Sequence, residues 1–209
     1  MNMKKIILPS LLLAASTSVF AENQVKTSGI YVGTGYGLFI YNADENWDDS
    51  KKNGELVEDT DGDTFKIYGG YQFNRVIAIE MAYTDYGDAS GYVYDKANVK
   101  HAVDQSPKSF SVAANAGYSF NNGLRPFALL GLSYMDLNSN YDFLDTNNPI
   151  AIKSGIGLEY SPAQLNGVQI RVALESDTYI AEAHDGLDKN DDLGVFSLSS
   201  LYAGVSYKF

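Results

Sequence analysis

Eight segments of the chain alternate between apolar residues and small or polar ones, which is the pattern of a β-strand with one apolar and one polar face. The last segment is the most regular: Leu201, Val205 and Phe209 share the apolar face, whereas Ser206 and Lys208 lie on the other. The predicted strands are residues 30–41, 64–73, 76–85, 110–120, 125–137, 150–160, 168–175 and 195–209.

The connections between these segments alternate in length. Short turns lie at residues 74–75, 121–124 and 161–166, whereas long polar stretches follow the first, third, fifth and seventh segments. Strands joined in this way form an antiparallel up-and-down sheet with all its long loops at one end. A long apolar last strand at an open edge would promote aggregation, and pairing with the first strand removes that edge. We therefore expect an all-β fold, a closed eight-stranded antiparallel up-and-down barrel.

The charges on the two faces distinguish a membrane barrel from a soluble one. Away from the strand ends, the apolar face carries no charged residue in any predicted strand, and in water it would be a very large exposed patch. If it were the core of a soluble barrel such as a lipocalin, the other face should be rich in lysine and glutamate. That face is rich in Gly, Ser and Ala instead. The pattern favours a transmembrane β-barrel over the soluble alternative.

The fifth segment is apolar on both faces, so its orientation needs a separate argument. We place Leu130 and Tyr134 outside because this puts Gly131 and Ser133 inside. Aromatic residues near the strand ends suggest two girdles at the membrane interfaces. The girdle at the short-turn end is expected to hold Phe73, Phe120, Phe127, Tyr160 and Phe209, and the other Tyr41, Tyr83, Tyr134 and Tyr179.

The charges predicted to point into the barrel are few and nearly balanced. Eight strands enclose a lumen just wide enough for side chains to fill, and an unpaired charge there would be costly. We predict an ion-pair network that fixes the strand register; the alternative is a narrow pore lined by the same groups. The network is expected to contain Lys66, Glu80, Lys153, Glu159, Arg171 and Glu175, with Lys208, Tyr31, Phe39, Tyr68, Phe127 and Tyr202 also pointing inward.

The amino terminus has the layout of a secretory signal. Lys4 and Lys5 precede the apolar residues 6–15, and small residues lead to Ala21. We predict a signal peptide at 1–21 and one barrel domain at 22–209. The chain has a net charge of −11, which argues against nucleic acid as a partner because phosphates would be repelled. It contains no cysteine and hence no disulfide or thiolate metal site.

At the level of motifs, the chain resembles the OmpA-like/OmpX-like family of small outer-membrane β-barrels. The resemblance extends over nearly all of residues 29–209, and it rests on residues 31–33 (Tyr-Val-Gly), 65–74 (Phe-Lys-Ile-Tyr-Gly-Gly-Tyr-Gln-Phe-Asn), 80–88 (Glu-Met-Ala-Tyr-Thr-Asp-Tyr-Gly-Asp) and 204–209 (Gly-Val-Ser-Tyr-Lys-Phe). It implies a place in the outer membrane of a Gram-negative cell, in contact with lipid and lipopolysaccharide. It also implies that Gly204, Tyr207 and Phe209 form the signal read by the barrel-assembly machinery. Family members that bind peptidoglycan use an additional periplasmic domain, so that activity is not implied here.

The resemblance implies a non-enzymatic surface protein without a cofactor, which supports membrane integrity and contacts a host or surface ligand through its outer loops. A narrow porin-like channel is the alternative, and a lipid A-modifying enzyme comes third. An enzyme would need an imidazole base, and His101 and His184 both lie in long loops. The first and fourth loops are acidic, notably at residues 44–63 and 185–192. We interpret them as solvated surface, with a divalent-cation site as the sharper alternative.

Overall fold

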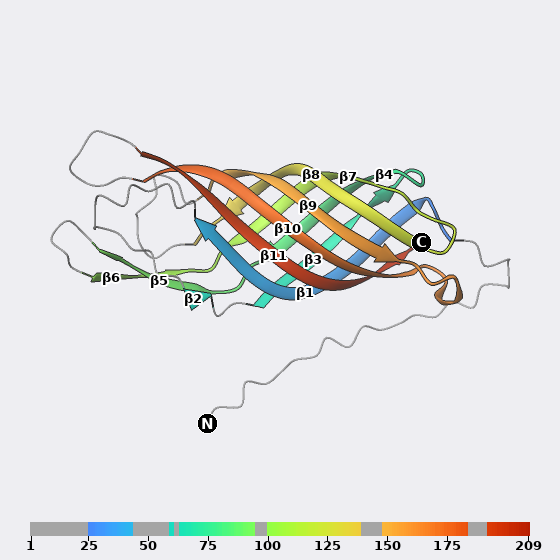
Figure 1. Cartoon of the computed structure of the whole chain (residues 1–209), viewed down its shortest axis with the longest axis horizontal. Helices are drawn as coiled ribbons and strands as arrows, with labels where there is room; N and C mark the ends of the chain where they lie inside the picture. The colour runs from blue at the N-terminus through green and yellow to red at the C-terminus, as the bar shows by residue number, and fades with distance from the viewer. Residues whose placement is uncertain (1–24, 44–58, 61–62, 95–99, 139–147, 184–191) are drawn as a thin grey trace, which may run out of the picture.

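The computed structural model describes residues 25–43, 59–60, 63–94, 100–138, 148–183 and 192–209. Within them, eight strands close into one antiparallel barrel, as predicted (Figure 1). In order around the barrel they are β1 (Gly29–Ala43), β11 (Asp192–Lys208), β10 (Val168–Ala183), β9 (Ile150–Tyr160), β8 (Leu124–Asp136), β7 (Lys108–Gly117), β4 (Ile77–Asp85) and β3 (Asp63–Gln72). The predicted signal peptide at 1–21 lies outside the described residues.

The first and last strands form the closing seam. Their register pairs Thr34 with Val205 and Val32 with Tyr207. The backbone N–H of Phe209 donates to the carbonyl oxygen of Ile30 at 2.9 Å, so pairing continues to the last residue. The seam thus removes the open edge that the apolar last strand would otherwise leave.

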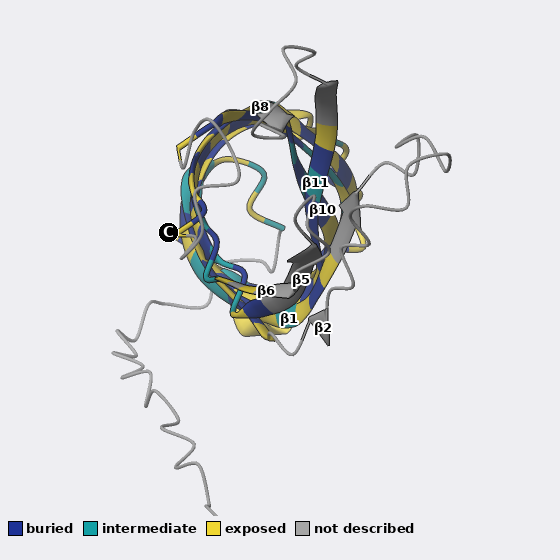
Figure 2. Ribbon diagram, turned by 90° about the vertical axis from the view of Figure 1, so that its left-hand side faces the viewer, coloured by how far each residue is buried: buried dark blue, intermediate teal, exposed yellow. Residues whose placement is uncertain are grey.

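Where side chains are described, they alternate between the two faces along the barrel strands, and Figure 2 shows this alternation of exposed and buried residues along the barrel wall. Leu130 is 66% and Ile170 is 48% exposed, whereas the neighbouring Arg171 is fully buried. The orientation predicted for the fifth segment is confirmed, with Leu130 and Tyr134 outside and Ser133 inside. The large apolar side chains therefore coat the outside of the barrel, and its core is the lumen.

Two residues assigned to the aromatic girdles lie inside the barrel instead, and for Phe127 this confirms its other assignment, among the inward-pointing residues. Phe127 and Tyr179 are 5% and 3% exposed and point into the barrel. Phe127 shares its face with Arg125, and Tyr179 shares its face with Asp177, so period-2 alternation places both rings inside. The girdle positions Phe73, Phe120, Tyr160, Phe209, Tyr83 and Tyr134 are exposed on the outer face, and the side chain of Tyr41 lies outside the described residues.

Beyond the long-loop end lies a small sheet that the sequence did not predict. It contains β2 (Asp59–Thr60), β5 (Ala89–Tyr94) and β6 (Lys100–Gln105), in the order β2-β5-β6. β5 and β6 form a hairpin that projects past the barrel in Figure 1. Its base is tied by a hydrogen bond from the N–H of Tyr86 to the carbonyl oxygen of Pro107 at 3.0 Å. The second long connection is therefore an extension of the barrel wall.

The short-turn end is compact. Asn74 Oδ1 accepts from the backbone N–H groups of Val76 and Ile77 at 2.8 and 3.0 Å, which fixes the β3–β4 turn. The 3₁₀ helix η1 (Ala163–Leu165) lies between β9 and β10. In the described residues, no helix is long and apolar enough to cross a membrane.

Candidate functional site: the filled lumen

Arg171 is the centre of a charged cluster in the half of the lumen nearer the short turns. Its guanidinium donates two hydrogen bonds to Glu80, at 2.9 and 2.8 Å, and two to Oε1 of Glu159, at 3.0 and 2.6 Å. Arg125 donates to the other oxygen of Glu159 at 3.0 Å and to Asn115 Oδ1 at 2.7 Å. The planar fork of arginine suits such two-point contacts with carboxylates. Five strands, β4, β7, β8, β9 and β10, are thereby joined across the barrel.

A second cluster, built around two lysines, lies nearer the long loops. Lys66 is bonded to Glu175, and Lys153 lies 3.1 Å from Glu175 and 3.4 Å from Asp177. Lys66 also lies 3.8 Å from Glu80, and this contact joins the two clusters. Each cluster holds two cations and two carboxylates, so neither leaves a net charge inside the barrel.

Tyrosine and phenylalanine rings fill the space between the charged groups. The guanidinium of Arg171 lies 4.2 Å from the ring centre of Tyr68 and 4.7 Å from that of Phe127. The Tyr31 hydroxyl donates to Glu80 at 2.8 Å, and the Tyr202 hydroxyl donates to Glu175. Cation–π contacts and charge-assisted hydrogen bonds are strong where water is excluded. The lumen is therefore packed with paired groups, as an eight-stranded barrel permits.

Above the lysine cluster, towards the long loops, the lumen becomes apolar. Tyr86 forms the boundary between the two layers because its hydroxyl is bonded to Asp177 while its ring packs 5.5 Å from that of Phe39. Tyr179 and Phe196 stack with their ring centres 5.5 Å apart. The buried apolar layer consists of Phe39, Tyr86, Ala89, Met135, Leu137, Ala151, Tyr179, Phe196 and Leu198. The barrel interior is thus filled by two different kinds of packing along its length.

The comparisons with known proteins agree with this architecture. The model of the family described as outer membrane protein beta-barrel domain matches residues 9–209. The chain belongs to this family. It is accordingly an outer-membrane β-barrel that crosses the bilayer several times by strands, and the prediction of this location is confirmed. The apolar outer face contacts membrane lipid.

Two solved structures show the same fold. The outer membrane protein OprG of Pseudomonas aeruginosa is 11% identical over 88% of this chain and 98% of its own, with a TM-score of 0.55. The N-terminal β-barrel domain of OprF from the same organism is 18% identical over 88% of this chain and 100% of its own, with a TM-score of 0.50. Among curated proteins, none matches the sequence.

All six residues predicted for the interior network lie in this outer-membrane barrel's two clusters. Sequence reasoning missed Arg125, Asp177 and the hydroxyl of Tyr86. Arg125 shares its face with Phe127, which was placed inward, so the alternation contained the necessary signal. Asp177 was missed because the seventh strand was ended at Glu175, whereas β10 continues to Ala183. Tyr86 was missed because the third predicted strand was ended at Asp85, whereas the alternation of buried residues continues from Ala82 and Thr84 to Tyr86. That the network sets the register remains a prediction.

The three residues of the predicted assembly signal lie together at the end of β11. A Cβ added to Gly204 would lie 2.9 Å from the carbonyl oxygen of Thr34, so the seam strands approach closely there. Tyr207 and Phe209 form an edge-to-face pair on the outer face, with ring centres 5.0 Å apart. Tyr71 with Phe73 and Tyr118 with Phe120 repeat this pair, at the same distance, at the ends of β3 and β7.

The features proposed for an enzyme or a cation site fall mostly on parts of the chain that the structure does not describe. His184 and most of the acidic residues at 44–63 and 185–192 lie outside the described residues. His101 is on β6, but its side chain is likewise outside them. Ser106, which lies near His101 in the sequence, donates to Asp88 at 2.6 Å. These residues therefore stay as hypotheses from the sequence.

Proposed function

We propose that this outer-membrane barrel is a non-enzymatic surface protein that supports membrane integrity and contacts a host or surface ligand through its extracellular side. The observation that carries the proposal is the filled lumen. Two ion clusters and an apolar layer occupy it in succession, and Arg171, Lys66 and Leu198 are at most 1% exposed. A barrel filled in this way supports a function on its outer surfaces over one in its interior.

The extracellular side offers structured material for such contacts. Long loops of these barrels face outward and short turns face the periplasm. The β5–β6 hairpin projects from the long-loop end, and β10 and β11 pair as far as Ala183 with Asp192. Backbone and side chains presented on paired strands lose less conformational entropy on binding than a free loop does. We infer that the hairpin is the first place to look for a ligand contact.

The experiment compares a deletion strain with strains that express either the intact protein or a hairpin-less variant. In that variant Asn-Gly replaces residues 89–105; the Ser106–Asp88 hydrogen bond shows that the two ends lie close together. We expect the deletion to raise sensitivity to detergent and antibiotics and to reduce host-cell binding. The hairpin-less barrel should restore resistance but not binding. Equal resistance of the deletion and intact strains would contradict the integrity role, and full binding by the variant would contradict the role of the hairpin.

The channel and the enzyme make different predictions. A channel would give single-channel steps in planar bilayers, and we expect none from the wild-type protein because the described side chains of both ion clusters and of the apolar layer are buried across the lumen. A lipid A-modifying enzyme would change the lipid A acyl pattern in a manner abolished by His101→Ala with His184→Ala. Either result, if observed, would replace the proposal.

A further inference from the structure

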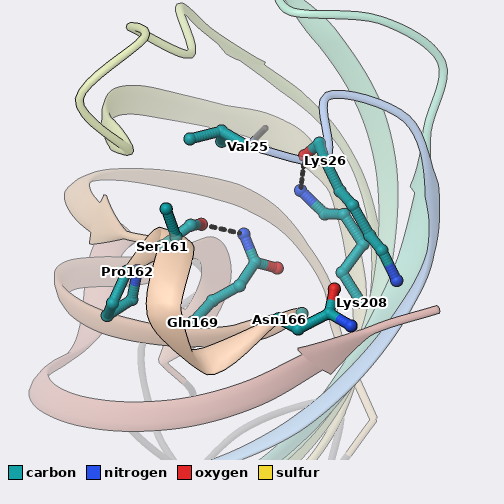
Figure 3. Close-up of a pocket in the computed structure, with 9 residues that line it drawn as sticks. Val25, Lys26, Ser161, Pro162, Asn166, Gln169 and Lys208 are labelled. Carbon is teal, nitrogen blue, oxygen red and sulfur yellow. Dashed lines mark hydrogen bonds between the residues drawn. The ribbon is translucent and has the colours of Figure 1, made fainter. Parts of the chain in front are cut away.

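A small polar pocket lies at the short-turn end of the barrel, apart from the two ion clusters (Figure 3). The segment before β1, the turn that contains η1 and the last residues of β11 form its walls. It is lined by polar residues together with Val25, Pro162, Ala163 and Gly167. The polar lining residues are Lys26, Ser161, Asn166, Gln169 and Lys208. None of them is acidic.

Lys208 differs from the other buried cations of the described lumen. Lys66, Arg125, Lys153 and Arg171 each contact at least one carboxylate within 4 Å. Lys208 is only 2% exposed, yet its Nζ donates to two neutral acceptors, the carbonyl oxygen of Lys26 at 3.4 Å and Oε1 of Gln72. An ammonium group carries three N–H donors, so these two acceptors leave one donor over. A buried charge whose hydrogen bonds go only to neutral groups retains most of its desolvation cost.

Gln169 places a second donor in the same pocket. Its side chain is 3% exposed, and Nε2 donates to the Ser161 hydroxyl at 3.0 Å. Figure 3 shows the amide of Gln169 and the ammonium of Lys208 on facing sides of the pocket, with Ser161 beside the amide. The Ser206 hydroxyl donates to Gln169 Oε1 at 3.5 Å. Because this contact engages the amide oxygen, the amide nitrogen is the atom that faces the pocket. The ammonium of Lys208, the amide of Gln169 and the hydroxyl of Ser161 surround one space, and together they can donate hydrogen bonds to an oxyanion.

Gly167 lies between the pocket and the membrane-facing ring of Tyr207. Its φ of +95° favours glycine, and an added Cβ would lie 2.5 Å from the carbonyl oxygen of Lys208 and 3.0 Å from the Tyr207 ring. The N–H of Lys208 donates to the carbonyl oxygen of Gly167 at 2.7 Å. The pocket thus adjoins the Tyr207–Phe209 pair, at the level where aromatic rings meet lipid headgroups.

We propose that this pocket is an oxyanion site for a phosphate group, with Lys208 as the counter-charge and Gln169 and Ser161 as neutral hydrogen-bonding partners. A phosphate offers several acceptor oxygens and matches a set of donors that come from different directions. The group is either free phosphate or the headgroup of a lipid in the periplasmic leaflet, and the two share the same chemistry. This site is separate from the proposed extracellular function and does not depend on it.

The test titrates the folded mature protein in a non-ionic detergent and follows the amide signals of Gly167 and Gln169 by NMR. One arm adds inorganic phosphate, and the other adds a short-chain phosphatidylglycerol; sodium chloride at equal ionic strength controls for screening. We expect saturable shifts in one or both arms, and the arm that saturates identifies the source. Lys208→Met should weaken the affinity about tenfold or more, because a hydrogen bond to a charged group is lost.

Two further variants keep the test decisive. Gln169→Met removes only a neutral donor and should weaken phosphate binding severalfold. This variant tests the site if Lys208→Met does not fold. Arg75→Gln removes a cation from the same end of the barrel, where Arg75 donates to Asn121 at 2.7 Å, and should leave the affinity unchanged. Shifts that sodium chloride reproduces, or that persist at full strength in both pocket variants, would overturn the proposal.

Discussion

Replacing Arg171 by methionine tests the interior network most directly. The side chain is fully buried and donates four hydrogen bonds to two carboxylates, Glu80 and Glu159. Methionine has a similar length but no charge, so the change leaves both carboxylates buried with fewer partners. Arg125 still contacts Glu159, and Lys66 still lies 3.8 Å from Glu80, so part of the compensation remains.

The expected loss is a large part of the stability of the barrel. Each charge-assisted hydrogen bond contributes roughly 1.5–3 kcal/mol, so the sum over the four bonds is an upper bound on the loss of stability. The loss is smaller than this bound because Arg125 and Lys66 still contact the two carboxylates. Breaking a buried ion pair by removing one partner typically costs about 3–5 kcal/mol, and we expect Arg171→Met to fall in this range. Glu80→Gln should cost less, because an amide still accepts a hydrogen bond from the guanidinium.

The assay is equilibrium unfolding in urea, with the protein folded into phospholipid vesicles and followed by circular dichroism. Heat resistance of the folded band in detergent gels provides a second readout. Arg75→Gln is the matched control, since Arg75 is an exposed cation in a turn and surface contacts like its hydrogen bond to Asn121 contribute about 0–1 kcal/mol to stability. If Arg171→Met and Glu80→Gln both left the free energy of unfolding and the heat resistance unchanged, the network would not stabilise the fold.

The other predictions concern the outer face, the last strand and the close contact between β7 and β8. Leu130→Lys or Ile170→Lys should destabilise the inserted barrel by about 2–4 kcal/mol near the bilayer midplane, measured by the same urea titration, and unhindered insertion would refute the assignment of this face to lipid. Phe209→Ala should lower the amount of assembled protein in cells much more than Phe120→Ala, although both break an edge-to-face pair at 5.0 Å and should cost similar stability in vitro; equal assembly would remove the predicted signal. Gly131→Leu should prevent folding because an added Cβ would lie 2.1 Å from the carbonyl oxygen of Val112, and a folded variant in vesicles would contradict this close approach.

The sequence predicted the barrel well because membrane and lumen impose opposite demands on alternate residues. The pattern of each strand therefore indicates which of its faces points outward. Even for the ambiguous fifth segment, Gly131 and Ser133 were enough to identify the inner face. The girdle assignment failed at Phe127 and Tyr179 because closeness to a strand end was given more weight than alternation. The β5–β6 hairpin was missed because its two strand sequences, Ala-Ser-Gly-Tyr-Val-Tyr and Lys-His-Ala-Val-Asp-Gln, show no clear alternation of apolar and polar positions.

The position of the ion pairs along the barrel follows from the same demands. A charge in the middle of the lumen lies behind lipid on every side, so it must find its partner inside, and the two clusters each balance two cations with two carboxylates. Lys208 does not need a partner inside the barrel, because it lies at the end of β11 beside a pocket that an anion from outside the barrel can enter. The apolar layer at the other end, around Phe39 and Leu198, needs no counter-charge at all. The charges described inside the barrel are paired with one another, apart from Lys208 at the rim. Binding partners should therefore be sought at this rim and on the extracellular strands.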